Sequence, residues 1–591
     1  MQTTAVLSLC AVLAAGAAPA VAQRPSRVQL PAGAIAAASG PSARRAAQRP
    51  APSPVRLPPG AVAATSAASP RRAARTSPRE RVQLPAGAVC YEVFVRSFFD
   101  GNGDGIGDLD GLIAKLDYIN DGNPSSTGDL GATCIWLMPV AASPSYHGYD
   151  VSSYYRVEPD YGTNADFTRL VAQAHRRGIR VLVDMVLNHS SSQNPWFQAA
   201  LHDTASPYRG WYRFSPTPQG QGPWGEVAWH KSPVRDEYYW GVFSSVMPDL
   251  DYDTPAVREE TKRIATFWLR DMGVDGFRLD AVPYLVEQGT CLIGCPGTHR
   301  FLHEWAAHVD SVKPGAWTVG EAWGNIDAQL PYYPDQLTSY FTFEIADSLL
   351  AAVRRGAAGG MLAGYLRLQD TLPPWRWSPF LSNHDGTRTM TALGGDAARA
   401  RLAATLLLTL PGTPFVYYGE EIGMTGDKPD PRLRTPMQWS AGRGLGFTTG
   451  TPWEQAQGDS AATTVAAQDR DPASLLNLYR RLIHLRRGNA ALATGRLVPL
   501  VAGDSSVVAY LRRDGSRAVL VVANLGGAAS GSVTLASPPG ALRPGAYGVR
   551  DLMTDDAGPT LRVGPDGRIA GFTVAAGIAP RGSLLLSLTR R

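Results

Sequence analysis

The chain has 591 residues, of which 44% are hydrophobic and 18% are charged. This length excludes a single ordinary core, so we expect two to four domains, and the apolar content is sufficient for a sizeable core. The net charge of +5 is unevenly distributed, because the stretch from Arg24 to Arg81 holds eleven arginines and one acid, Glu80. The remaining chain is therefore mildly acidic. We expect no nucleic-acid partner, and we expect the basic stretch to be a solvated tail.

Residues 1–22 are typical of a secretory signal peptide. Residues 5–18 are apolar but too few to span a bilayer, and Ala20-Val-Ala22 has the small-residue pattern of a cleavage site. We expect a secreted or periplasmic protein with no stable membrane association. An uncleaved anchor is the alternative.

Residues 23–80 are rich in Ala, Pro, Arg and Ser and contain a repeat. Arg27-Val-Gln-Leu-Pro-Ala-Gly33-Ala recurs in similar form from Val55 and again from Arg81, where it leads into the first predicted strand. A stretch with so few bulky apolar side chains does not offset the entropy lost on ordering it. We therefore predict a disordered linker.

Short apolar runs alternate with helix-like segments along the rest of the chain. This alternation predicts a parallel sheet. The first two predicted strands are 89–98 and 133–139. Four further runs end in polar, ionisable residues: 181–189, 273–282, 316–323 and 380–385. In a closed parallel barrel, such strand ends gather at the C-terminal mouth.

The loop after the first predicted strand alternates oxygen-bearing side chains with glycines. The oxygen ligands it offers are the side chains of Asp100, Asn102, Asp104 and Asp108 and the carbonyl of Ile106. Calcium prefers a shell of this kind, so the loop predicts a structural calcium site. A loop held only by Asx turns is the alternative.

The stretch Gly273-Val-Asp-Gly-Phe-Arg-Leu-Asp280 carries an arginine and an aspartate two residues apart. Side chains at this spacing on a strand share a face, so Arg278 lies beside Asp280. A neighbouring guanidinium favours the ionised carboxylate, which is the form that a nucleophile needs. A purely structural ion pair would have the same pattern.

Taken in order, these four runs resemble the signature regions of the α-amylase superfamily, glycoside hydrolase family thirteen, over roughly residues 88 to 590. The resemblance implies that Asp280 is the nucleophile, Glu321 the general acid/base, and Asp385 a third carboxylate that holds the sugar ring. It implies that the substrate-binding residues are Tyr149, Asp184, His189, Arg278 and His384.

The resemblance also implies the fold class. We expect an α/β protein with a (β/α)8 TIM barrel, a subdomain inserted after the third strand and a C-terminal antiparallel β-sandwich. The expected boundaries are 81–188 and 249–494 for the barrel, 189–248 for the inserted subdomain and 495–591 for the C-terminal domain. We expect a monomer.

Details within the family point in two directions. Tyr146 stands where exo-acting oligo-1,6-glucosidases have an acidic residue, which favours a groove open at both ends. The first hypothesis is therefore a secreted α-amylase that hydrolyses α-1,4-glucosidic bonds in starch-like glucans or maltooligosaccharides through a covalent intermediate.

Met247 indicates a position between the oligo-1,6-glucosidase and neopullulanase groups. Pro283-Tyr284 and Arg434-Thr-Pro-Met-Gln-Trp439 resemble glucosidases and trehalose synthases, so a maltose-acting glucosidase or glucosyl transferase is the alternative.

Four cysteines remain after the signal peptide. Cys291 and Cys295 are close enough in sequence to form a disulfide in an oxidising compartment, and the sequence leaves this open. Cys90 and Cys134 lie near the starts of adjacent predicted strands, and we expect them to be buried thiols.

Overall fold

The computed structural model describes residues 84–457, 462–574 and 577–591. The expected signal peptide and the whole of the expected linker precede these residues, so both predictions lie outside the described part. No helix in the described ranges is both long enough and apolar enough to cross a bilayer.

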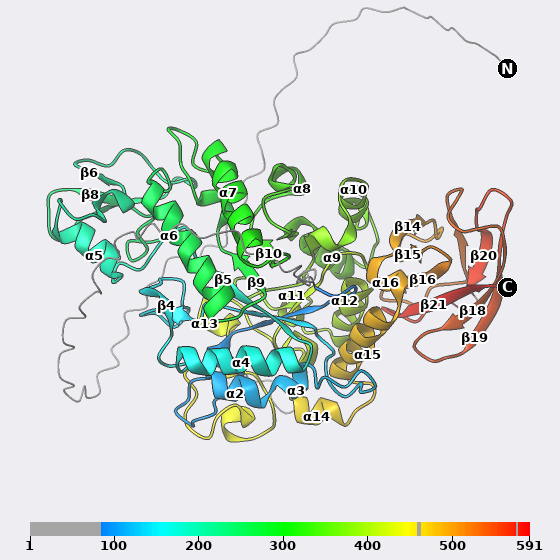
Figure 1. The fold of residues 1–591 in the computed structure, drawn as a ribbon. Helices are drawn as coiled ribbons and strands as arrows, with labels where there is room; N and C mark the ends of the chain where they lie inside the picture. The colour runs from blue at the N-terminus through cyan, green and yellow to red at the C-terminus, as the bar shows by residue number, and fades with distance from the viewer. Residues whose placement is uncertain (1–83, 458–461, 575–576) are drawn as a thin grey trace, which may run out of the picture. The chain divides into compact units, whose positions relative to one another are not determined.

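Eight parallel strands form the centre of the molecule (Figure 1). In chain order they are β1 (Cys90–Val93), β2 (Cys134–Leu137), β5 (Arg180–Met185), β9 (Gly276–Leu279), β10 (Trp317–Gly320), β11 (Ser339–Phe341), β12 (Trp377–Ser378) and β13 (Phe415–Tyr417). They pair in the order β12-β11-β10-β9-β5-β2-β1-β13. The amide of Thr413 donates to the carbonyl of Trp377 at 2.9 Å, and that of Phe415 donates to Pro379 at 2.9 Å. These bonds close the sheet, so the predicted barrel is confirmed.

Helices alternate with the strands and cover the outside of the barrel (Figure 1). The longer ones are α4 (Asn164–Arg176), α6 (Pro255–Thr266), α7 (Pro296–Val312), α9 (Phe343–Arg355), α10 (Ala363–Thr371), α12 (Ala397–Thr409) and α15 (Leu475–Gly488). The shorter ones are α1 (Val95–Phe98), α2 (Leu109–Ala114), α3 (Leu116–Ile119), α8 (Ile326–Gln329), α11 (Thr389–Ala392), α13 (Asp430–Leu433), α14 (Val465–Asp469) and α16 (Ala490–Thr494). Helix α4 shows why these segments form helices that cover the barrel. Thr163 and Asp166 form a capping box at its start, and an apolar stripe beginning at Phe167 faces the sheet.

Two predicted strands differ in extent from the observed ones. The stretch 89–98 is a strand only as far as Val93 and continues as the short helix α1. The stretch 380–385 is a loop, because β12 ends at Ser378, directly before a proline. Proline has no N–H to donate to a sheet, so Pro379 marks the end of that strand.

The barrel interior changes character along the strands. Its closely packed side chains include Cys90, Cys134, Trp136, Leu182, Trp317, Val319, Phe341 and Phe415. Two residues further along three strands, on the same face, stand Glu92, Asp184 and Glu321. The interior is therefore apolar in its lower layers and charged at the carboxyl ends of the strands, where parallel barrels have their functional sites.

The expectation that Cys90 and Cys134 are thiols is wrong in this structure. Both are fully buried, as expected, but they form a disulfide across β1 and β2. The parallel register pairs Cys90 directly with Cys134, with a Cα–Cα distance of 4.3 Å. Cys291 and Cys295 form a second disulfide, with a Cα–Cα distance of 5.8 Å.

A small region follows the third barrel strand. Its elements are α5 (Pro195–His202), β6 (Phe214–Ser215), β7 (Trp229–Lys231) and β8 (Tyr238–Trp240), and the hairpin β3 (Ala141–Ala142) and β4 (Ser153–Val157) precedes it. Strands β6, β8 and β7 form a three-stranded antiparallel sheet. Trp211, Tyr239 and Trp240 are buried, whereas Trp224 is exposed. The buried aromatic residues are therefore structural, and the others remain partly accessible.

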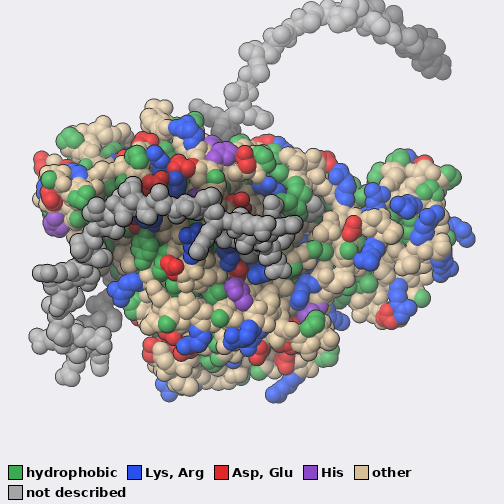
Figure 2. Space-filling model, viewed as in Figure 1, with side chains coloured by type: hydrophobic (Ala, Val, Ile, Leu, Met, Phe, Trp, Pro, Cys, Tyr) green, Lys and Arg blue, Asp and Glu red, His purple; other side chains and the backbone are tan. Residues whose placement is uncertain are grey.

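The last part of the chain is antiparallel. Its strands are β14 (Arg496–Leu500), β15 (Val507–Asp514), β16 (Arg517–Asn524), β17 (Val533–Ala536), β18 (Gly545–Asp551), β19 (Ala557–Val563), β20 (Ala570–Val574) and β21 (Ser583–Arg590). Six of them pair as β14-β15-β16-β21-β18-β19, and β17 pairs with β20, which confirms the predicted antiparallel β domain. Residues 495–591 contain eleven arginines and six aspartates, with no lysine or glutamate. Accordingly, blue side chains outnumber red ones on this part of the surface in Figure 2.

Candidate active site

Asp280 and Glu321 leave neighbouring strands at the same level of the barrel. The β9–β10 register pairs Leu279 with Gly320, and the Glu321 amide donates to the Leu279 carbonyl at 2.9 Å. The next residue on each strand therefore carries its side chain into the same region of the barrel mouth. The two carboxyl groups that the sequence singled out lie together.

Arg278 links three carboxylates. Its Nη1 lies 2.8 Å from Asp184 Oδ1 and 2.7 Å from Asp280 Oδ1, and its Nη2 lies 2.7 Å from Glu321 Oε2. The register explains the first contact, because Asp184 on β5 is paired with Arg278 on β9. Arg278 is 1% exposed, so these ion pairs are shielded from water and fix the carboxyl groups of Asp280 and Glu321.

Glu321 is held in an environment that keeps its proton near neutral pH. Burial raises its pKa to about 7, the charges of Asp280 and Asp385 add to this effect, and Arg278 opposes it. Its Oε1 accepts a hydrogen bond from Trp323 Nε1 at 2.9 Å, and its Oε2 accepts one from the Ala281 amide at 3.2 Å. The main cause is thus burial, rather than repulsion from a neighbouring acid alone.

Asp280 is more acidic than Glu321 but less acidic than an exposed aspartate. Burial raises its pKa to about 6, while Arg278 lowers it and Asp184 and Asp385 raise it. The expected Arg278 contact is present, yet burial has the larger effect. At neutral pH the Asp280 carboxyl group is still mostly ionised, so the two carboxyl groups differ in the direction needed for a nucleophile and a proton donor.

Asp385 belongs to a second charged group at the barrel mouth. His384 lies between two acids, with Nδ1 2.6 Å from Glu92 Oε1 and Nε2 3.1 Å from Asp385 Oδ2. Burial lowers the pKa of His384, but the charges of Asp385 and Glu92 outweigh burial and raise it to about 10. Burial raises the pKa of Asp385, but protonated His384 and Arg434 bring it well below its usual range. Asp385 is therefore a fixed anion whose side chain remains 41% exposed.

Tyr149 and His189 complete the set of predicted substrate-binding residues. The Tyr149 hydroxyl donates to Asp184 Oδ2 at 3.0 Å and lies 2.7 Å from His384 Nε2, and its ring stacks on His384. His189 Nε2 lies 3.1 Å from the Tyr149 carbonyl, and burial lowers its pKa to about 4. His189 is thus neutral and fixes the Tyr149 backbone.

Aromatic side chains flank Glu321. Trp323 lies two residues after it, and its ring centroid lies 5.8 Å from that of Tyr284. Trp224, from the region inserted after β5, lies 5.0 Å from Tyr284 and 6.2 Å from Trp323. An apolar wall of this kind excludes water from the proton donor and offers flat faces to a sugar ring.

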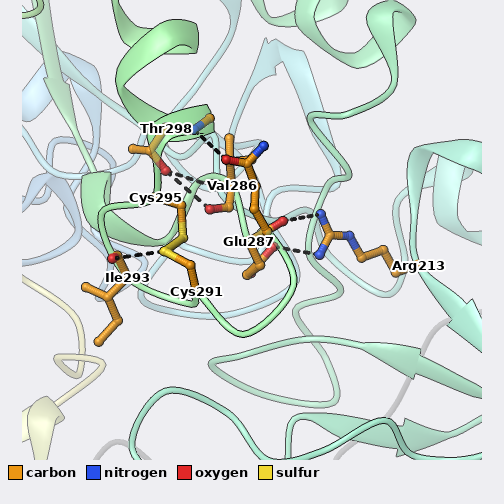
Figure 3. Close-up of a disulfide and its surroundings, with 9 residues drawn as sticks. Arg213, Val286, Glu287, Cys291, Ile293, Cys295 and Thr298 are labelled. Carbon is orange, nitrogen blue, oxygen red and sulfur yellow. Dashed lines mark hydrogen bonds and ion pairs between the residues drawn. A yellow bond between two sulfur atoms is a disulfide. The ribbon is translucent and has the colours of Figure 1, made fainter.

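The segment after Asp280 is anchored by a disulfide and an ion pair (Figure 3). Cys291–Cys295 closes a short loop before α7, and Glu287 extends from the same segment toward Arg213. Arg213 Nη1 lies 3.3 Å from Glu287 Oε2, and its Nη2 donates to the Glu287 carbonyl at 3.1 Å. These contacts tie the inserted region to the loop that follows Asp280.

Comparison with known proteins agrees with this geometry. The family model described as the catalytic domain of alpha amylase matches residues 92–495. The chain belongs to the α-amylase family of glycoside hydrolases.

The relatives that resemble this chain are named for different activities. The chain is 38% identical over 444 residues to "Alpha-amylase 3" of Dictyoglomus thermophilum, which covers 74% of this chain and 84% of that one. It is also 38% identical over 486 residues to "Trehalose synthase/amylase TreS" of Mycolicibacterium smegmatis, covering 72% and 79% of the two chains. Among solved structures, the α-amylase from H. orenii superposes with a TM-score of 0.73 at 38% identity, covering 85% of this chain and 99% of that one.

Glu92 and Arg434 belong to the site but were missed as site residues. Glu92 stands alone in an apolar strand, and that isolated acid in a buried run was the available signal. Arg434 Nη2 lies 2.8 Å from Asp385 Oδ1, and its Nε donates to the His384 carbonyl at 3.0 Å. Arg434 Nη1 also lies 3.5 Å from the hydroxyl of Tyr146. Tyr146, which stands where oligo-1,6-glucosidases have an acidic residue, therefore borders the group of Arg434, His384 and Asp385.

The loop predicted to bind calcium is held by hydrogen bonds of its own. Asp100 accepts bonds from several loop amides and from the hydroxyl of Thr448, and Asp108 caps α2 through the Gly111 amide at 2.6 Å. Asn102 and Asp104 accept bonds from amides two residues ahead, as in Asx turns. No three His, Cys, Asp or Glu side chains within the described ranges are arranged to hold a metal ion.

Proposed function

We propose that this α-amylase family member hydrolyses α-1,4-glucosidic bonds of starch-like glucans or maltooligosaccharides with retention of configuration. The observation that carries the proposal is the contact of one buried guanidinium, Arg278, with both Asp280 and Glu321. Between pH 6 and 7, the pKa of about 6 for Asp280 and about 7 for Glu321 favour an ionised nucleophile beside a protonated donor.

The reaction has two steps, and in each step Asp280 makes or breaks one bond while Glu321 gives or takes one proton. The Asp280 carboxylate attacks the anomeric carbon, the bond from that carbon to the leaving oxygen breaks, and the Glu321 proton passes to the leaving oxygen. Glu321, now ionised, takes a proton from water, whose oxygen attacks the anomeric carbon and releases Asp280. Two inversions retain the α configuration.

The group of His384 and Asp385 is suited to holding the sugar ring. Asp385 is an accessible anion next to an imidazolium and the Arg434 guanidinium. A carboxylate accepts hydrogen bonds from sugar hydroxyls, and such bonds strengthen as positive charge develops on the ring in the transition state. Asp385 would act by this route without forming a covalent bond.

A maltose-acting glucosidase or glucosyl transferase is the second candidate. It is supported by the resemblance of Arg434-Thr-Pro-Met-Gln-Trp439 and Pro283-Tyr284 to glucosidases and trehalose synthases, and by the equal identity to a relative named trehalose synthase/amylase. The decisive difference is the substrate size that the site accepts. Tyr146 supports the first candidate because its neutral side chain stands where exo-acting relatives have an acid.

The product profile separates the two candidates. The purified enzyme is incubated separately with amylose and with maltose, and products are followed with time by chromatography. A spread of oligosaccharides from amylose, with maltose nearly unchanged, supports an endo-acting amylase. Glucose or trehalose from maltose, with amylose intact, overturns the first candidate. The anomeric form of the first products, read by NMR, tests retention, since an initial β-anomer contradicts the mechanism.

We also propose that the enzyme acts outside the cytoplasm and binds calcium at the 100–108 loop. The two disulfides support an oxidising compartment. Calcium binding would require Asn102 and Asp104 to turn from their amide partners toward the ion. Thermal unfolding with calcium and with a chelator tests this. An equal unfolding midpoint in both, or an unchanged calcium effect in Asp104→Ala, rejects the site.

A further inference from the structure

Two arginines lie buried where the antiparallel domain packs against the barrel helices. Arg486 is on α15 and Arg512 is on β15, and both side chains are 0% exposed. The hydroxyls of Tyr365 and Tyr510 act on both of them, and Arg486 also acts on Arg512. No carboxylate in the described part of the chain forms an ion pair with either guanidinium, so two positive charges share an apolar interior without a counter-charge.

Backbone carbonyls provide part of the missing negative charge. Arg486 Nη1 donates to the carbonyls of Leu408 and Leu410 at 2.9 and 2.8 Å, and its Nη2 donates to that of Gly412. Arg512 Nε donates to the carbonyl of Gly495 at 3.0 Å. Arg512 Nη1 also donates to the Thr409 carbonyl, at the C-terminus of α12. This end of a helix carries a partial negative charge, which offsets less than one of the two unit charges.

Three donors in the same cluster have no acceptor. They are Arg486 Nε, Arg512 Nη2 and the hydroxyl of Tyr365, which α10 contributes, and each is buried without a partner in the described ranges. The neighbouring Tyr510 hydroxyl, by contrast, is 2.6 Å from Thr409 Oγ1. Tyr365 acts electrostatically on both guanidiniums, so the three groups are neighbours. Buried donors are normally satisfied, so unpaired donors on three neighbouring elements indicate a missing acceptor.

Both arginines remain charged at neutral pH. Burial lowers the pKa of Arg486 to about 10, and burial together with repulsion from Arg486 lowers that of Arg512 to about 9. Neither value reaches 7, so loss of a proton does not relieve the charge. An anion would satisfy the unpaired donors and also offset the charge, whereas a water molecule would do only the first.

We propose that this cluster binds a small monovalent inorganic anion, chloride, between Arg486, Arg512 and Tyr365. A halide accepts N–H and O–H donors from several directions and supplies one negative charge. Because the cluster is fully enclosed, a single atom suits it better than a polyatomic ion. The site lies at the packing of β15 on α10, α12 and α15, so its effect is on the stability of that packing and not on the reaction at Arg278.

Thermal unfolding of the full chain in chloride tests the proposal. The protein is dialysed into sodium gluconate, and sodium chloride replaces gluconate stepwise at constant ionic strength. A saturating rise in the unfolding midpoint of about 2–4 °C is expected, because a ligand that binds only the folded state stabilises it. An unchanged midpoint across the series overturns the proposal.

Matched variants locate the effect. Arg512→Met removes one buried charge and should abolish the dependence on chloride, with activity preserved. Arg590→Met removes an exposed arginine of the same domain and should leave the dependence intact. Dependence that persists in Arg512→Met overturns the site. Should that variant fail to fold, Tyr365→Phe removes only the unpaired hydroxyl, and it should weaken the chloride response measurably.

Crystals grown in sodium bromide give an independent test. Bromide replaces chloride and scatters anomalously, so a peak is expected within hydrogen-bond distance of Arg486 Nε and Arg512 Nη2. A peak only elsewhere, or electron density for water alone at the cluster, overturns the proposal.

Discussion

Arg278 and Arg512 are both fully enclosed, yet their surroundings are opposite. Arg278 contacts three carboxylates; burial lowers its pKa, but Asp184 and Glu321 outweigh burial and raise it well above the usual value. Arg512 contacts only carbonyls in the described part, and burial and Arg486 lower its pKa to about 9. The comparison shows that a buried guanidinium acquires a role from what faces it. At the barrel mouth Arg278 opposes the effect of burial on the pKa of Asp280 and Glu321, and behind the barrel one nitrogen of Arg512, Nη2, lacks an acceptor.

The largest effect on activity is expected for Asp280→Asn. The amide keeps the size of the side chain and still accepts a hydrogen bond from Arg278, but it is no nucleophile. We expect hydrolysis of amylose to fall by about 10⁴-fold or more, with little change in the unfolding midpoint. Steady-state rates and thermal unfolding of the same preparation measure both. Activity like that of the wild type would refute Asp280 as the nucleophile.

Arg278→Met is expected to have the largest effect on stability. It leaves Asp184, Asp280 and Glu321 buried without their shared cation, and breaking a buried ion pair from one side costs about 3–5 kcal/mol. Denaturant unfolding measures the loss, and activity should fall with it because both carboxyl groups lose their fixed positions. A loss below 1 kcal/mol would mean that solvent or another cation compensates for the missing guanidinium.

The corresponding substitution in the buried arginine cluster behind the barrel, Arg512→Met, should lower the free energy of unfolding by less. It removes an uncompensated charge while leaving the carbonyls of Gly495 and Thr409 without a donor, so we expect a loss of about 1–3 kcal/mol in gluconate buffer. Activity should be unchanged. A loss as large as that of Arg278→Met would contradict the contrast between the two sites.

The parts of the site that the sequence predicted are those encoded in short runs. Asp280 and Glu321 end apolar strands, and the family resemblance specified their roles. Glu92 was missed because its partner, His384, lies 292 positions away and nothing local marks the pair. The Cys90–Cys134 bond required the register of β1 on β2. Arg486 and Arg512 belong to no motif, and only the packing of a helix against a strand brings them together.

The acids around Arg278 should also give the enzyme a narrow pH dependence. Activity requires ionised Asp280 and protonated Glu321, so kcat/KM should fall as pH drops below about 6 and as it rises above about 7. The two acids interact, so the limbs report the pair rather than either residue. The profile is measured on a soluble maltooligosaccharide. A flat profile from pH 5 to 9 would contradict these assignments.

The smallest effect is expected where a single hydrogen bond adjusts that profile. Trp323 Nε1 donates to Glu321 Oε1, and a donated bond favours the ionised form of the acid. Trp323→Phe keeps an aromatic ring beside Glu321 but removes the donor, so the pKa of Glu321 should rise. The alkaline limb of the profile should then move to higher pH by up to about one unit, while the acidic limb hardly moves. Arg512→Met is the control, because it changes a buried charge far from the pair and should leave both limbs in place. A downward shift of the alkaline limb in Trp323→Phe would mean that the indole acts by excluding water and not by its N–H, which would change the account of how Glu321 keeps its proton.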